Sequence, residues 1–357
     1  MARAKKTEPS IEAFNPSSYF PAPTLPDVSK APKVRQSGHY VDQKLKYTYP
    51  EQRQMTIFEI LDPDVIGKVE KYDVRYEGIR LTPPEERLLN GIYKLLRDKS
   101  ETKDIKSPTF YKGNYDGGQI TEWGGEAHKR ALISLKPTEM YMAYLGRDDY
   151  SGKEILEVNK TLEGLAGKRF LMIYDRVRSV QVNKGKTETR TDRIEKYAPL
   201  IELVKYTRDL TDEELKRLDK GDERIRQAKG EIILALNPIL TDQIQTKYVE
   251  YPEDINRRMI IAVGGDAKRV TQAMHILSAW CAREISNKRY KSEINADRLP
   301  YVLKLDKYIQ ESRRKLIQTT IDNAIQACKN LGLILDVSLE AGKAGQLKYV
   351  FTLNKDY

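Results

Sequence analysis

The stretch from Gln310 to Leu353 limits most strongly what this chain of 357 residues can fold into. Apolar side chains recur at helical spacing between Leu316 and Leu331, and Gly332 follows at the position where glycine commonly ends a helix. Two apolar, β-favouring segments, 333–339 and 347–353, then flank a polar turn that contains glycine. The stretch therefore predicts a long helix followed by a β-hairpin.

A helix followed by a hairpin with a basic tip is the second half of a winged helix. That module places a helix in the major groove of DNA and its hairpin against the backbone or minor groove. The basic start of the helix can contact base edges or phosphates, the polar face that follows can contact bases, and the lysines of the hairpin can neutralise phosphates. A solvated helix face is the alternative. The predicted DNA-binding residues are Arg313, Arg314, Lys315, Gln318, Thr319, Asn323, Lys343 and Lys348.

The same order of elements is expected twice along the chain. The first copy is predicted to contain helices at 84–97, 138–145 and 151–165, a strand at 131–135, and a hairpin whose turn is at 183–186. The second copy is predicted to contain helices at 267–285, 297–304 and 311–331, followed by the hairpin. Sequence identity between the copies is low, so only the pattern repeats. We predict an α+β fold with two tandem winged-helix domains, at 54–240 and 250–357.

The first copy carries a more mixed set of charges than the second. Its longest predicted helix alternates lysines with glutamates, and acidic groups facing phosphates oppose DNA binding. Its hairpin is strongly basic and could follow phosphates or serve as an exposed dimer arm. The secondary DNA-binding candidates are Lys153, Lys160, Arg176, Arg178, Lys184 and Lys186. This module is expected either to bind DNA or to make protein contacts, such as those of a homodimer.

Residues 1–53 are rich in proline and polar side chains and poor in large aliphatic ones. This composition predicts a flexible N-terminal arm. On that interpretation, deletion of residues 1–50 leaves the melting temperature nearly unchanged. Beyond the arm, a short helix is expected at 56–63, a strand at 74–81 and an irregular, glycine-rich insertion at 98–128.

The charge balance favours a polyanionic partner. The formal net charge is +10 and the isoelectric point is about 9.2, which indicates nucleic acid before membrane. The N-terminus lacks the apolar region of a signal peptide, and no apolar run approaches the length that spans a bilayer. We therefore expect a cytoplasmic, nucleoid-associated protein with no membrane partner.

Signals of an enzyme are largely missing from the sequence. The three histidines are far apart, no Cys/His pair has metal-ligand spacing, and the two cysteines, Cys281 and Cys328, lie in apolar helical contexts typical of buried thiols. The phosphate-binding pattern that ends in Gly-Lys-Ser/Thr does not occur. No catalytic residue, metal or cofactor is predicted.

The chain resembles the replication initiator (Rep) proteins of plasmids and mobile elements, which carry tandem winged helices. The similar segments are Arg313–Ile325, Gly332–Leu339 and Lys348–Leu353 in the second copy and Leu81–Leu89 and Leu162–Tyr174 in the first. The glycine-rich insertion and the proline-rich arm depart from the family's pattern.

The resemblance implies a protein that binds repeated sites in double-stranded DNA at an origin and recruits the host initiator and replicative helicase. It also implies a homodimer formed through the first winged helix. A transcriptional regulator on the same scaffold is one alternative, and a DNA-processing enzyme of a mobile element, such as a primase or relaxase, is another.

Overall fold

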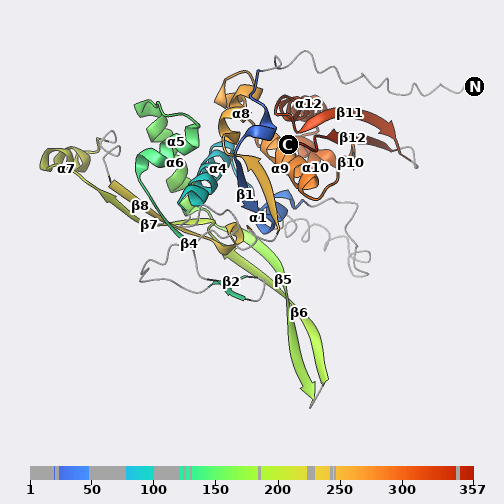
Figure 1. The fold of residues 1–357 in the computed structure, drawn as a ribbon, viewed down its shortest axis with the longest axis horizontal. Coiled ribbons are helices and arrows are strands. Elements are labelled where there is room, and N and C mark those ends of the chain that lie inside the picture. Colours follow the sequence, from blue (N-terminus) through green and yellow to red (C-terminus); the bar gives the residue numbers. More distant parts are fainter. Residues whose placement is uncertain are drawn as a thin grey trace, which may run out of the picture.

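Figure 1 shows the protein as a computed structural model, an elongated body of mixed helices and sheets. The α+β fold class is confirmed. The structure describes the following residues: 20, 24–47, 78–99, 121–123, 126–128, 131–183, 186–222, 230–241, 244, 247–342 and 346–357. The helix expected at 56–63, most of the strand expected at 74–81 and most of the glycine-rich insertion lie outside them.

The second module, residues 272–353, contains one more strand than the sequence predicted. A three-stranded antiparallel sheet has the order β10-β12-β11, and its first strand is short and polar, which concealed it. Gly332, with φ of 80°, ends the last helix as predicted. The elements are α9 (Gln272–Ser286), β10 (Lys291–Asn295), α10 (Leu299–Val302), α11 (Asp306–Gln310), α12 (Arg314–Asn330), β11 (Ile334–Ala341) and β12 (Leu347–Leu353). A 3-10 turn at Ala267–Arg269 precedes them.

The first module, residues 83–236, contains the three predicted helices and the predicted strands. Pro83 and Pro84 begin its first helix behind Thr82, and Glu85 accepts a hydrogen bond from the Thr82 amide at 2.8 Å. The elements are α4 (Pro83–Asp98), β2 (Thr121–Trp123), β3 (Glu126–His128), β4 (Ala131–Leu135), α5 (Pro137–Leu145), α6 (Gly152–Gly167), β5 (Phe170–Asn183), β6 (Lys186–Ala198), β7 (Ile201–Arg208), α7 (Asp212–Asp219) and β8 (Gly230–Leu236).

The predicted match between the two hairpins is wrong. Strand β4 pairs with β8, and β8 pairs with β7, so the sheet that corresponds to β10-β12-β11 is β4-β8-β7. Within the described part of the chain, β5 and β6 pair only with each other, and they extend away from the body as a long ribbon (Figure 1). The ribbon is therefore an insertion after α6. The sequence suggested the wrong pair because β5 and β6 are adjacent in the chain, whereas α7 and its flanking loops separate β7 from its partner β8.

The predicted flexible arm is wrong for residues 24–47. Val28–Lys30 forms a 3-10 turn, β1 (Lys33–Ser37) pairs with β9 (Tyr248–Pro252), and α1 (Gly38–Leu45) follows. Tyr40 and Val41 are only 1% and 0% exposed. Prolines lie at the boundaries of these elements, where the missing amide costs nothing. Deletion of this segment would open the core, so the expected tolerance to deletion no longer follows.

Buried polar contacts join α1, α4 and α8 (Ile255–Ala262). The Lys44 ammonium of α1 lies 2.7 Å from Glu86 of α4, with both side chains at least nine-tenths buried. Asn256, near the start of α8, donates to the carbonyl of Arg87 at 2.8 Å and accepts from Asn90 at 3.0 Å. The buried apolar residues of both modules form one continuous cluster. The two modules are therefore held against each other by shared core.

Candidate nucleic-acid interface

Helix α12 is exposed at its start and enclosed at its end. Arg314, Lys315 and Leu316 are exposed, whereas Ala324 and Cys328 are fully buried. The helix packs on α9, α8 and β11. The first two turns of the helix are therefore its most accessible part.

Three basic residues begin α12 without a side-chain cap. Ser312, with φ of 54°, turns the chain between α11 and α12, and Arg313 occupies the N-cap position. Cations are unfavourable at the positive end of a helix dipole. The stability of α12 therefore does not explain why three basic residues begin it. Arg313 bonds Glu311 at 2.8 Å. The side chains of Arg314 and Lys315 form no hydrogen bond or salt bridge with the described residues.

The polar residues that follow are partly engaged with the protein. Gln318 donates to Asp322 at 2.8 Å and to the Tyr349 hydroxyl of β12 at 3.2 Å. Thr319 donates to the carbonyl of Lys315 at 2.9 Å. Asn323 is half-buried, and the oxygen of its side-chain amide accepts no hydrogen bond from the described residues. Base contacts by these side chains stay a prediction, and the Gln318–Tyr349 contact was not foreseen.

Burial affects the ionisation of groups beside Gln318. It raises the pKa of Asp322, and the hydrogen bond from Gln318 opposes that rise. It also raises the pKa of Tyr349. A neutral tyrosine hydroxyl therefore holds the Gln318 amide on the side of the helix that faces the sheet. The alternation of side chains in 347–353 is the signal that could have indicated this position for Tyr349.

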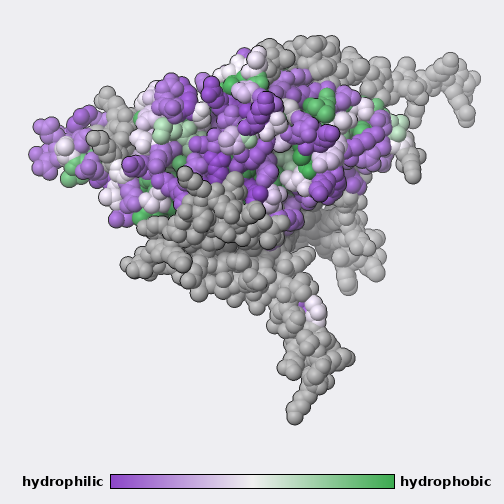
Figure 2. All heavy atoms as spheres, in the orientation of Figure 1, coloured by the Kyte–Doolittle hydropathy of each residue, from purple (hydrophilic) through white to green (hydrophobic). Residues whose placement is uncertain are grey.

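The hairpin β11–β12 carries one predicted contact within the described residues. Lys348 bonds Glu293 of β10, and this bond raises the pKa of Lys348. Lys343 lies outside the described residues. Leu335 and Leu339 of β11 are exposed, but the face of the molecule in Figure 2 is mainly hydrophilic, with only scattered apolar groups.

The candidates in the first module are dispersed. Lys153 and Lys160 are exposed on α6. The neighbouring glutamates serve the fold, because Glu154 closes a capping box with Ser151 and Glu157 bonds Arg87 and Tyr144 at 2.9 and 2.6 Å. Arg176, Arg178 and Lys186 lie on the ribbon β5–β6, whose side chains at these positions are outside the described part, as is all of Lys184.

Other chemistry is sparse in the described part of the chain. No group of three potential metal ligands occurs there. Cys281 and Cys328 are buried free thiols, and burial raises the pKa of Cys281 and lowers that of His275. No described helix combines the length and the apolar character that crossing a bilayer requires.

Comparison with known proteins identifies relatives across most of the chain. It is 24% identical over 297 residues to the virulence plasmid protein pGP2-D of Chlamydia psittaci, covering 78% of this chain and 81% of the relative. It is 26% identical over 278 residues to the protein of that name in Chlamydia muridarum, covering 71% and 77%. No protein-family model matches. The Rep family is therefore not established by these matches, which are to proteins named for a plasmid.

Proposed function

We propose that this chain is a plasmid-encoded protein that binds repeated DNA sites at an origin and initiates replication there. The observation that carries the proposal is the exposed basic start of α12. Arg313 occupies the N-cap position of α12, and Arg314 and Lys315 begin it, in a module that runs helix, strand, three helices and hairpin. That order and the sheet order β10-β12-β11 fit a winged helix.

Two further observations support a DNA ligand. The chain has a formal net charge of +10, which favours association with a polyanion. Its relatives are named as virulence plasmid proteins and match it over more than two thirds of their length. The proposal of a role in replication rests on the resemblance to Rep proteins. The proposed partners, which are the host initiator and the replicative helicase, and the proposed homodimer formed through the first module rest on the same resemblance.

The arrangement of the two modules supports binding along an extended site. Hairpins β7–β8 and β11–β12 lie toward opposite ends of the body (Figure 1). Because the modules share a core, binding by one would hold the other near the same duplex and raise affinity without new contacts. Bending the DNA between two contacts would also help to open it.

Footprinting of the full-length protein on the plasmid that carries its gene tests this function. Protection of several direct repeats, weakened as salt is raised, is expected for an initiator. Protection of a single palindrome at a promoter would instead identify a transcriptional regulator. Metal-dependent nicking or nucleotide incorporation by the purified protein would identify a DNA-processing enzyme.

A further inference from the structure

A second basic surface lies away from α12. It is a cavity of about 530 Å³. Its wall is formed by Leu45 at the end of α1, by Tyr47, by α9 and the turn after it, and by β10 and α10, with no described residue of α12. A volume of this size lies in the usual range for small-ligand sites. The cavity therefore has room for a ligand group of its own.

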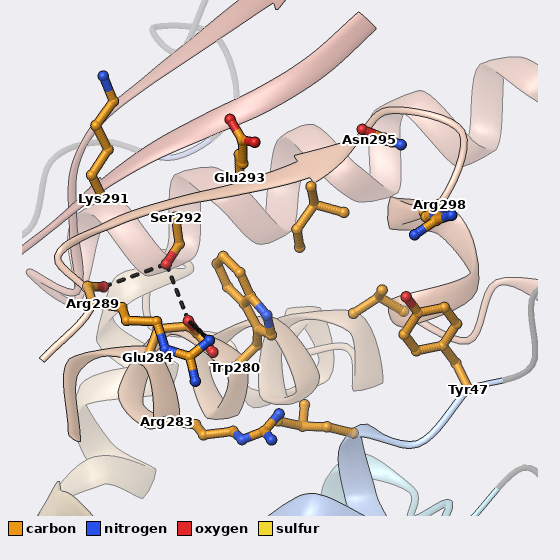
Figure 3. A pocket seen from close by; sticks show the side chains of 13 residues that line it. Tyr47, Trp280, Arg283, Glu284, Arg289, Lys291, Ser292, Glu293, Asn295 and Arg298 are labelled. Atoms are coloured by element: carbon orange, nitrogen blue, oxygen red, sulfur yellow. Dashed lines mark hydrogen bonds and ion pairs between the residues drawn. The ribbon is translucent and has the colours of Figure 1, made fainter. Parts of the chain in front are cut away.

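An aromatic ring lies in the middle of this cavity. Trp280 of α9 is half-buried and lies between the helix and strand β10 (Figure 3). One side of its ring system is fixed by an edge contact with Phe351, with ring centroids 5.3 Å apart. Among the described residues the indole makes no hydrogen bond. A flat, fixed ring with open space beside it can stack against a planar group.

Cationic side chains flank Trp280 on two sides. Arg289 and Lys291 lie on one side, and Arg298 lies on the other beside Tyr47 (Figure 3). With Arg283, the wall has four cationic against two acidic side chains. Glu284 contacts Arg289 and Ser292 at 3.4 and 3.2 Å, Glu293 bonds Lys348, and Arg283 bonds Asp42 of α1 at 3.0 Å. With these outer partners included, the cations still outnumber the acids by two. The cavity retains a positive excess.

We propose that this cavity binds one nucleotide of an unpaired nucleic-acid strand, with the base stacked on Trp280 and the flanking phosphates near Lys291 and Arg298. Single-strand sites combine stacking aromatics with a positive groove. A base in a strand has one phosphate before it and one after it, which matches an aromatic ring with cations on both sides. An acidic peptide would need the cations but not the ring between them. A base inside a duplex cannot reach the ring. The site deepens the proposed function, because opening an origin releases an unpaired strand.

Intrinsic fluorescence tests the stacking directly. The chain has two tryptophans and 22 tyrosines, so Trp123→Phe leaves Trp280 as the only tryptophan in the full-length protein, and excitation at the long-wavelength edge of indole absorption excludes the tyrosines. An oligothymidine is expected to quench this emission to saturation, and a duplex of equal length is not. Equal quenching by polyglutamate would reduce the site to a general polyanion surface. Equally tight binding of thymidine monophosphate would overturn the assignment to a strand.

Substitutions separate this site from α12. Trp280→Leu is expected to weaken oligothymidine binding about fivefold or more, as loss of a stacking ring does, and to leave binding of the duplex repeats unchanged. Lys291→Glu should also weaken oligothymidine binding. Because Lys291 is exposed, this change leaves the contact between Trp280 and Phe351 intact. Lys216→Glu on α7 is the charge-matched control. If both cavity variants bind the oligomer as the native protein does, the proposal fails, whether or not α12 binds duplex DNA.

Discussion

The two modules place their charges differently. At the start of α6, Ser151 and Glu154 cap the helix, and in the same module Glu86 and Glu157 pair with Lys44 and Arg87. At the corresponding position in the second module, α12 begins with exposed cations and no side-chain cap. These charges of the first module hold the fold together, whereas the side chains of Arg314 and Lys315 at the start of α12 bond no described residue.

The largest expected effect concerns the buried charge of the first module. Lys44→Met leaves Glu86 buried without its partner and is expected to destabilise the protein by about 3–5 kcal/mol. Urea denaturation of the full chain measures it. The double variant Lys44→Met/Glu86→Met should recover much of the loss, and failure to recover it would show that the pair is not the source.

The second prediction concerns the basic start of α12. Arg314→Glu combined with Lys315→Glu is expected to weaken binding to the protected DNA repeats by about a hundredfold, because two phosphate partners become repulsive. Stability should hold or rise slightly, since acids suit a helix N-terminus. Fluorescence anisotropy and thermal melting report the two effects. Lys153→Glu combined with Lys160→Glu on α6 is the charge-matched comparison in the first module, and an equal loss there would remove the distinction between the modules.

A smaller, reciprocal pair of changes tests the two helix starts. Ser151→Ala removes the cap of α6 and is expected to cost about 1 kcal/mol. Arg313→Ser supplies a cap for α12 and should add up to about 1 kcal/mol of stability while weakening DNA binding. The contrast fails if both changes shift the melting temperature in the same direction.

The smallest effect is expected at Asp322. Because burial raises its pKa, the ionised carboxylate opposes folding at pH 7, and this penalty disappears as pH falls through the folded and then the unfolded pKa. Asp322→Asn is therefore expected to raise the free energy of unfolding slightly at pH 7 and to leave it unchanged near about pH 3. Urea denaturation at the two pH values measures this. A larger gain at low pH would contradict it.

The sequence predicted what depends on neighbouring residues. The long helices of both modules and the hairpin after Gly332 followed from local spacing, and so did the basic start of α12, whereas the short helix α11 was not predicted. Pairings between distant segments did not, because register depends on partners that periodicity does not identify. The docking of 33–37 on 248–252 and the β4-β8-β7 sheet are of this kind. The cavity around Trp280 was missed for the same reason, since α1, α9 and β10 meet only in three dimensions.

The pairing of β1 with β9 also sets the order in which the protein can form. Arg35 and Glu250, which bond across these strands, are 215 residues apart in the chain. At common rates of synthesis, roughly 10–40 seconds pass between the emergence of one strand and that of the other. During that interval the apolar residues of α1 lack their final cover. The β1–β9 pairing therefore cannot close until β9 has been synthesised, and α1 gains its contact with α9 only after that later helix has emerged as well.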